Sequence, residues 1–308
     1  ELPLQLQRFA EQVKLRQAGQ LEELPAKQGA AFLDALESTE ELPRVLTGFP
    51  ALDKITGGLR LGSVSVLGAF PSAGKTAFAM NLARDAMAHQ QRVLFFSLEM
   101  TEQQLYERLC ANACEVLYSA ISNHRIGSVD RQRVRDYVQA VSASKKLYLF
   151  DSMFYVERMA NAIVRLQPQL VVVDYLQKAR TKERISNNAE RLEFLVDEFK
   201  RLAMQNHCHI LLLSQHSREA SRDKATLFTL KGSSGIEAGG DYILLLDRPC
   251  VYDKQQPPAK AELKLVKHKY GQLVDINLFF EGEYQRFRQK TDSDIYPEAP
   301  RKEEVKPW

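Results

Sequence analysis

Residues 68–76 read GAFPSAGKT and lie between an apolar run and a helix-like segment. The Gly-Lys-Thr ending is that of the phosphate-binding loop G-x-x-x-x-G-K-[ST], but Ala69 holds its first position and Gly68 stands one place early. The stretch is therefore either a working nucleotide site with a relaxed first position or a glycine-rich turn that imitates one. The first position mainly needs a small residue, so the residues around the loop have to decide.

From about residue 45 onward the chain alternates short apolar runs with helix-like segments. Near-continuous hydrophobic strands separated by helices are typical of a mainly parallel sheet with helices on both faces. The last apolar part reads as two strands around a Tyr-Gly-Gln turn, which predicts an antiparallel hairpin at the sheet edge. The sequence thus predicts an α/β fold. The expected strands cover 63–69, 92–99, 146–151, 170–176, 209–215 and 241–247, the hairpin covers 261–281, and the helices cover 75–89, 101–113, 130–143, 155–166 and 189–206.

Three regions are expected along the chain. Residues 1–42 read as a helix and connector, residues 43–289 as one α/β domain, and residues 290–308 as a charged, proline-containing and loose tail. In the first region Leu2, Leu6, Phe9 and Val13 form an apolar stripe at helical spacing. A second short helix is expected from Ala30 to Leu36, after interruptions at Gly19 and Pro25.

Composition narrows the functional classes. Of the 308 residues 44% are hydrophobic, enough for a sizeable core, and the net charge of +3 gives no global argument for nucleic acid. The four cysteines include no C-x-x-C pair, which favours reduced cytosolic thiols over a zinc site. No apolar run reaches the roughly 18 residues of a membrane helix, and no signal peptide opens the chain. We therefore expect a cytoplasmic protein without membrane contact, and the initial Glu1 suggests a piece of a longer chain.

The residues around GAFPSAGKT have the context that a phosphate loop requires. A buried strand leads into a tight loop, and a helix begins at Lys75 and Thr76. Backbone N–H groups would surround the phosphates, Lys75 would reach the β- and γ-phosphates, and the Thr76 hydroxyl would bind Mg²⁺. The expected ligands are thus ATP, or another nucleoside triphosphate, and Mg²⁺. The residues expected to bind the nucleotide are Ser72, Ala73, Gly74, Lys75, Thr76 and Ala77.

Three further polar side chains stand where apolar strands end. Asp174 ends LVVVD in the form of a Walker B aspartate, which helps to hold Mg²⁺. Glu99 follows another strand and could deprotonate the attacking water, and Gln215 ends a third strand where its amide could touch the γ-phosphate. Each also has a plainer explanation, such as a helix cap, a first-turn glutamate or a loop residue. Because the carboxyl ends of parallel strands form one ligand-binding edge, we expect the three to gather there.

The sequence from Thr47 to Phe287 resembles the C-terminal motor domain of DnaB-type replicative helicases. The segments that carry the resemblance occur in the family's order: TGFPALDKITGGL, PSAGKTAFAMNLA, FFSLEM, VVVDYLQ, LLLSQ, SGIEAGGDYILLLDR and KHKYG. The family often carries alanine at the first loop position. The resemblance implies a RecA-like fold that assembles into a homo-hexameric ring and hydrolyses ATP between subunits.

The resemblance also implies roles for individual residues. Lys75 and Thr76 match the Walker A pair, Glu99 the catalytic glutamate, Asp174 the Walker B aspartate and Gln215 the phosphate-sensing glutamine. Lys267 and Lys269 match a Lys-x-Arg pair that reaches into the neighbouring subunit's site, so lysine replaces the family's arginine finger. Phe70 likewise replaces a usual arginine. Since lysine lacks the planar, two-pronged donor of arginine, hydrolysis is expected to be slow or to use another basic group.

Two loops are expected to contact single-stranded DNA. The family's central loop corresponds here to KGSSGIE, and the run KARTKERISNN after Asp174 carries four basic residues, although such a run is often only a solvated surface. The resemblance also implies that residues 1–18 act as a linker helix that docks on the next subunit, with a helicase loader or primase as a possible partner. The residues expected at the DNA are Arg180, Lys182, Arg184, Arg218, Lys231, Gly232 and Ser234.

Other functions stay open at this point. A recombination or repair ATPase similar to RadA is one, because KHKYG is similar to a segment of that family, although SLEM and DYLQ favour the DnaB side. A degenerate, DnaB-like regulator of a true helicase is another, given Lys269 and the altered DNA loop. A small-molecule kinase with a phosphate loop fits least, since the hairpin and the basic loop suit a ring.

Overall fold

The computed structural model describes residues 29–30, 32–34, 36–37, 43–215 and 233–297. The chain divides into two compact units, Glu1–Pro43 and Arg44–Trp308. In the first unit the described residues between 29 and 37 are helical, as the sequence predicts for 30–36. The apolar stripe of residues 1–18 lies outside the described residues. The second unit holds the α/β fold.

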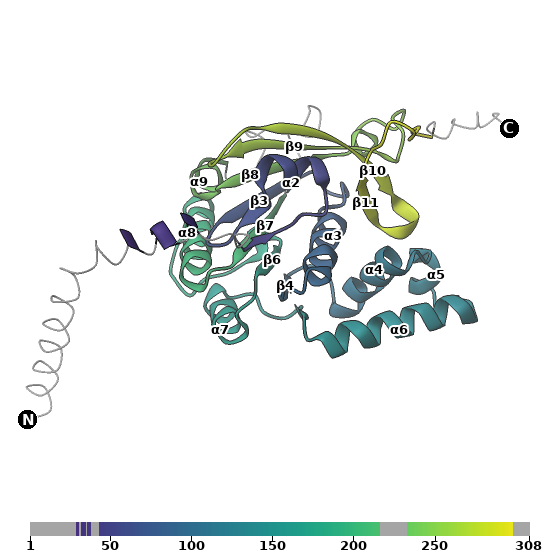
Figure 1. Cartoon of the computed structure of the whole chain (residues 1–308), viewed down its shortest axis with the longest axis horizontal. Coiled ribbons are helices and arrows are strands. Elements are labelled where there is room, and N and C mark those ends of the chain that lie inside the picture. The colour runs from purple at the N-terminus through teal and green to yellow at the C-terminus, as the bar shows by residue number, and fades with distance from the viewer. Residues whose placement is uncertain (1–28, 31, 35, 38–42, 216–232, 298–308) are drawn as a thin grey trace, which may run out of the picture. The chain divides into compact units, whose positions relative to one another are not determined.

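Within the described residues, nine strands form one sheet in the order β11-β10-β9-β8-β3-β7-β6-β4-β5 (Figure 1). The six strands from β8 to β5 run parallel to one another, and β9, β10 and β11 continue the sheet in antiparallel pairing. A predominantly parallel sheet with a C-terminal antiparallel hairpin is the predicted fold class, and it is confirmed. The strands are β3 (Val64–Ala69), β4 (Val93–Ser97), β5 (Leu147–Phe150), β6 (Leu170–Asp174), β7 (His209–Gln215), β8 (Tyr242–Asp247), β9 (Lys260–His268), β10 (Val274–Glu281) and β11 (Arg286–Gln289). A separate antiparallel pair joins β1 (Arg44–Val45) to β2 (Leu59–Arg60).

The five predicted helices are found to within two residues at each end, as α3 (Lys75–Ala88), α4 (Glu102–Cys114), α6 (Ser128–Ser144), α7 (Val156–Leu166) and α8 (Asn188–Asn206). Thr101 caps α4 through a capping box with Gln104, and the Asn187 side chain caps α8. Figure 1 shows α7 and α8 on the opposite side of the sheet from α3. No helix in the described parts of the chain has the length and apolarity to cross a membrane. Three further helices are not among the predicted segments: α2 (Pro50–Thr56), α5 (Tyr118–Ser122) and α9 (Ser233–Gly239).

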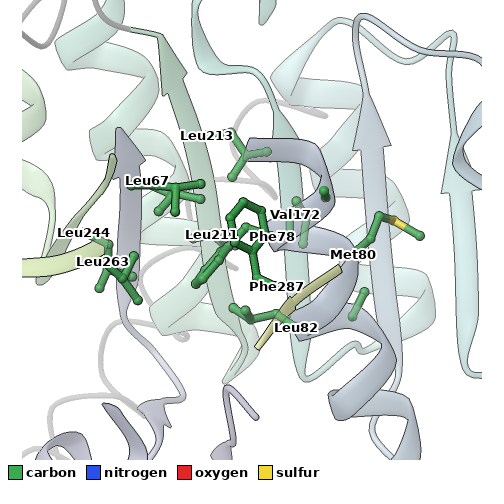
Figure 2. Close-up of a cluster of buried hydrophobic side chains, with 14 of the residues drawn as sticks. Leu67, Phe78, Met80, Leu82, Val172, Leu211, Leu213, Leu244, Leu263 and Phe287 are labelled. Carbon is green, nitrogen blue, oxygen red and sulfur yellow. The ribbon is translucent and has the colours of Figure 1, made fainter. Parts of the chain in front are cut away.

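Two hydrophobic cores lie on the two faces of the sheet, because successive strand residues point to opposite sides. In β7, Leu211 and Leu213 belong to the core under α3, whereas Ile210 and Leu212 belong to the core under α7 and α8. Figure 2 shows the first core, where Phe78 of α3 lies among leucines of the parallel strands and beside Phe287. All four cysteines are unpaired, as expected, and three of them are buried.

The strand β11 is not anticipated by the sequence, which predicts a hairpin at the sheet edge and nothing beyond it. Phe287 supplies the reason: its ring packs 4.5 Å from that of Phe280 and 6.0 Å from that of Phe78, measured between centroids. The Asn81 side chain of α3 also bonds the backbone N–H and carbonyl of Phe287, at 3.1 and 3.0 Å. The edge strand is thereby attached to α3, which starts at the phosphate loop.

The beginning of the expected tail also differs from the prediction of a loose segment. Tyr296 stacks on Phe279 of β10 with ring centroids 5.7 Å apart, and its hydroxyl donates to the Leu278 carbonyl at 3.0 Å. Asp294 forms an ion pair of 2.6 Å with Arg288 of β11. Residues 290–297 therefore continue the packed unit, and residues 298–308 lie outside the described residues.

Candidate nucleotide-binding site

Strand register places the predicted site residues at one edge of the sheet. Ala69, the last residue of β3, lies opposite Gln215 of β7, and Ser97 of β4 lies opposite Asp174 of β6. The Leu98 N–H also donates to the Asp174 carbonyl at 2.6 Å, which fixes Glu99 beside it. The expected gathering at the carboxyl edge is thus found, in a pocket of about 670 Å³. The pocket is lined by Pro71, Ser72, Gly74, Lys75, Thr76, Glu99, Met100, Gln104, Arg108, Asp174, Gln215, Arg248, Phe280 and Gln285.

The phosphate loop requires glycine at its last turn. Gly74 has a φ of 97°, and a Cβ atom there would lie 2.9 Å from the ring of Phe287. Gly74 is also the N-cap of α3 and places no side chain over the helix start. The first-turn N–H groups of α3 therefore point toward the pocket with the positive end of the helix dipole, an arrangement that suits an anion.

Lys75 is a half-buried cation with weak partners. Its Nζ lies 3.4 Å from the Ala69 carbonyl and 3.5 Å from that of Phe70, both long for charged hydrogen bonds. Burial lowers the pKa of Lys75, while the carboxylates of Asp174 and Glu99 act against that shift. A phosphate group in the pocket would supply the strong acceptors that the ammonium group lacks.

Thr76 and Asp174 supply adjacent oxygen donors of the kind that Mg²⁺ prefers. The Thr76 hydroxyl donates to the Asp174 carboxylate at 2.6 Å, and Asp174 is almost fully buried. Burial raises the pKa of Asp174 to about 6, although the Thr76 hydrogen bond and the Lys75 charge both oppose this shift. Among the described residues no three acidic, histidine or cysteine side chains form a complete metal cage. One or two protein oxygens beside a phosphate pocket fit Mg²⁺, which usually keeps waters and shares substrate phosphates.

The backbone of Gln215 is held in position by the side chain of Gln177. The Gln215 N–H donates to the Gln177 side chain at 3.3 Å, and Gln177 in turn donates to the Ser214 hydroxyl at 2.8 Å. The end of β7 is thus tied to the segment that follows Asp174. Glu99, in contrast, has an exposed side chain, as a group that must meet water would need.

Several residues of the pocket are not singled out by sequence patterns. The Arg248 guanidinium lies 3.9 Å from the centre of the Phe280 ring and donates to the Pro258 carbonyl at 2.9 Å. Arg248 follows the apolar run of β8 as Gln215 follows that of β7, so its place after a strand was the available signal. Gln104, Arg108 and Gln285 belong to a helix and a turn, and no motif marks them.

Lys267 and Lys269 lie near the amino end of β8, at the opposite end of the parallel strands from the pocket. Lys267 of β9 pairs with Ile243 near the start of β8, whereas the end of β8 at Asp247 lies on the pocket side. The Lys267 ammonium donates to the Glu237 carbonyl, and Lys269 lies 3.6 Å from the Asp241 carboxylate with 60% of its side chain exposed. Neither lysine lines the pocket of its own chain.

The basic loop after β6 is exposed and attached to its neighbours through the backbone. Arg180, Lys182 and Arg184 are all exposed. The Arg180 N–H donates to the Phe154 carbonyl at 2.8 Å, and that of Lys182 to the Glu157 carboxylate at 2.8 Å. In the second loop Ser234 lies in the first turn of α9. Arg218, Lys231 and Gly232 lie outside the described residues.

Comparison with known proteins gives one consistent family. The replicative DNA helicase DnaB of Haemophilus influenzae is 31% identical over 277 residues, which is 86% of this chain and 59% of the relative. That of Leifsonia xyli is 29% identical over 274 residues, 83% of this chain and again 59% of the relative. This chain therefore spans only about 59% of the length of these curated relatives.

Solved structures show the same fold. A separately solved ATPase domain matches with a TM-score of 0.78 at 24% identity, over 87% of this chain and 99% of the other. A DnaB-like replicative helicase, solved for its interactions with primase, matches with a TM-score of 0.76 at 24% identity, over 87% of this chain and 66% of the other. The family model of the DnaB-like helicase C terminal domain matches residues 44–289. Because that match covers most of the chain, the protein belongs to the family of DnaB-like helicase C-terminal domains.

Proposed function

We propose that this chain is the motor of a ring-forming DNA helicase that hydrolyses ATP between subunits and moves along single-stranded DNA during replication. The observation that carries the proposal is the common pocket of Lys75, Thr76, Glu99, Asp174 and Gln215 in a chain of this family. The motor corresponds to residues 43–289 together with the packed residues 290–297, and it is preceded by a linker in residues 1–42. A role in replication would place it in the cytoplasm, with the DNA.

Each pocket residue has a distinct task in hydrolysis. The N–H groups from Ser72 to Ala77, together with Lys75, hold the triphosphate, and Thr76 and Asp174 provide the protein ligands of Mg²⁺. Bound Mg²⁺ supplies positive charge for the β- and γ-phosphates. The Glu99 carboxylate orients the attacking water and accepts its proton, and the Gln215 amide senses the γ-phosphate.

The basic loops are the proposed contacts to DNA. Arg180, Lys182 and Arg184 project from an exposed loop whose backbone is held in place, which suits repeated contact with a phosphate backbone. Arg218, Lys231, Gly232 and Ser234 would form the second contact segment. Such contacts follow the backbone rather than the bases, as translocation along any sequence requires.

The position of the hairpin lysines supports assembly with other copies of the chain, and the proposed assembly is a homo-hexamer. Lys267 and Lys269 lie away from the pocket of their own chain, so a catalytic role for them needs the pocket of a neighbouring subunit. Residues 1–18 would dock on the next subunit as the linker helix. Primase or a helicase loader is the proposed further partner, in keeping with the relative that was solved for its interactions with primase.

The decisive experiment measures ATP hydrolysis with and without single-stranded DNA, alongside the mass of the particle in a non-hydrolysable ATP analogue. A hexamer whose hydrolysis is stimulated by DNA is expected, with Lys75→Ala removing the activity and the exposed Lys54→Ala leaving it intact. A monomer that ignores DNA would instead support the second candidate, a nucleotide-dependent regulator of another helicase. The lysine at position 269 is the observation that favours this second candidate.

A further inference from the structure

Arg108 places a third basic side chain in the nucleotide pocket, beside Lys75 and Arg248. It lies on α4, the helix that follows Glu99, and none of the described carboxylates forms an ion pair with it. A guanidinium group without a carboxylate partner is unusual at a half-buried position, because its charge has to be balanced by something. A negative charge that balances Arg108 would therefore have to lie in the pocket that this side chain lines.

Neutral groups hold the guanidinium in place. Its Nη1 donates to the side-chain oxygen of Gln285, and Gln285 in turn donates to the Gly282 carbonyl at 2.8 Å. The ring of Tyr118 lies 5.5 Å from the guanidinium carbon. The Nε–H is buried and has no hydrogen-bond partner in the described part of the chain. The side chain is therefore fixed in position while one donor and its charge stay unsatisfied.

The helix that carries Arg108 is anchored in the core. Leu105 and Leu109 are fully buried on the inner side of α4, and the capping box at Thr101 fixes the start of the helix. Gln104 lies one helical turn before Arg108 and lines the same pocket, so one face of α4 forms this wall. Gln285 belongs to the turn before β11, which Phe287 and Asn81 attach to α3. The phosphate loop and the guanidinium are thus held by one packed body.

The charge of Arg108 also acts on Asp174, the proposed Mg²⁺ ligand. It helps to lower the pKa of Asp174, against the larger effect of burial. A triphosphate would bring several negative charges into this space. Guanidinium groups bind phosphate oxygens with two parallel hydrogen bonds, which lysine cannot do. An arginine held in place by its neighbours in the same chain could offset a lysine at the position of the arginine finger.

We propose that Arg108 contacts the terminal phosphate of the bound nucleoside triphosphate from within its own subunit. This inference rests on the proposed nucleotide pocket and adds to it a residue that distinguishes a triphosphate from a diphosphate. Lys75 holds the β- and γ-phosphates from the loop side, and Arg108 binds the γ-phosphate from the α4 side. The subunit thereby supplies an arginine of its own to bind the negatively charged γ-phosphate. Lys269 of the neighbouring subunit can offer that phosphate only a point charge.

The test compares nucleotide affinities of the full chain by titration calorimetry, with a non-hydrolysable ATP analogue and with ADP, both with Mg²⁺. In Arg108→Gln the affinity for the ATP analogue is expected to fall about tenfold or more, since a charge-assisted contact is lost, while that for ADP changes less than about threefold. Arg108→Lys keeps the charge and should lose less. The matched control is Arg133→Gln, because Arg133 bonds the carbonyl of Cys114 at the end of the same helix and lies outside the pocket.

The outcomes separate this inference from the proposed function. Equal losses for the ATP analogue and ADP in Arg108→Gln, or no loss for either, would overturn the role of Arg108 while leaving the nucleotide site standing. Wild-type protein that binds neither nucleotide would overturn both. Thermal unfolding of each variant establishes that the fold is kept, and Arg108→Lys tests the inference through its graded loss should Arg108→Gln be unstable.

Discussion

The Thr76 hydroxyl donates a hydrogen bond of 2.6 Å to the Asp174 carboxylate, across 98 residues of sequence. Thr76 follows β3 and Asp174 ends β6, and β7 lies between these two strands in the sheet. The contact therefore spans the carboxyl end of β7, which is Gln215, and links the phosphate loop to β6. It holds the three strand ends together in one site, an arrangement of fixed polar groups that an electrostatically driven reaction needs.

Glu99→Gln is expected to separate hydrolysis from binding. The amide keeps the size of the side chain but cannot accept a proton, so ATP turnover should fall by about 10²–10⁴-fold. Affinity for the ATP analogue should stay within about threefold of wild type, because in this scheme Glu99 acts on water and not on the phosphates. Steady-state hydrolysis and equilibrium titration measure the two effects. Glu102→Gln is the control, as a nearby exposed carboxylate outside the pocket. Comparable losses in both variants would contradict the role of Glu99.

The sequence predicts the sheet and most of the site for a physical reason. The parallel strands are buried on both faces, so runs such as residues 170–174 are apolar throughout and stand out against the helices. A polar residue that directly follows such a run, as Asp174 and Gln215 do, must lie at the carboxyl edge. Chain order and periodicity therefore contain the information for the part of the pocket made by strand ends.

The remaining part of the pocket depends on contacts that no local pattern encodes. The strand β11 has the sequence RFRQ, and its place follows from the packing of Phe287 under the phosphate loop and its bonds to Asn81. Gln285 enters the pocket because of that packing, and Arg108 because α4 packs beside α3. Neither lies at a strand end, and a glutamine or arginine in an amphipathic helix or turn is ordinarily a solvated side chain.

Lys269 is expected to act only across a subunit boundary, and mixing two inactive variants tests this. Lys269→Ala keeps its own pocket, and Lys75→Ala keeps its own hairpin, so each alone should lose DNA-stimulated hydrolysis. Mixed rings contain interfaces with one intact pocket facing one intact lysine, and these should regain measurable activity. Lys269→Arg should raise turnover above wild type, because arginine adds the planar donor. Failure of the mixture to exceed its components would argue against action in trans.

The three basic residues of the loop after β6 are expected to contact DNA phosphates. Replacing Arg180, Lys182 and Arg184 by glutamine should weaken binding to single-stranded DNA similarly for different sequences. Each lost phosphate contact should also reduce the salt slope of log affinity by about 0.7. Fluorescence anisotropy over a range of salt concentrations gives both quantities. A variant with Arg131, Arg135 and Lys145 replaced, three basic residues on or next to α6, is the control of equal charge. The same slope in the loop variant and in wild type would rule out a DNA contact there.

His209 is expected to make the fold sensitive to mild acid. The ring is fully buried at the start of β7, with Nδ1 3.0 Å from the Arg60 carbonyl and Nε2 2.9 Å from the Ser65 hydroxyl. Burial lowers the pKa of His209 to about 4, against an ordinary value near 6.5. As the pH falls, the imidazole of His209 is therefore protonated in the unfolded chain before it is protonated in the folded chain. The stabilisation by neutral His209 is complete above about pH 6.5 and is lost as the pH falls through 4.

His209→Gln isolates this contribution, because glutamine retains an amide donor and acceptor but does not titrate. The free energy of unfolding is measured in urea for both proteins, and the value for the variant is subtracted from that for wild type. This difference should be roughly 2 kcal/mol lower at pH 5 than at pH 7. The raised pKa of Asp174 has the opposite effect, since a folded-state value of about 6 lets the folded protein gain stability as the pH falls below it. That effect is common to wild type and variant, and so are the charges of Asp241 and Lys200 that act on the ring. The difference between the two proteins therefore reports His209 alone, and a difference that stays constant from pH 7 to pH 5 would show that the ring does not gain its proton on unfolding.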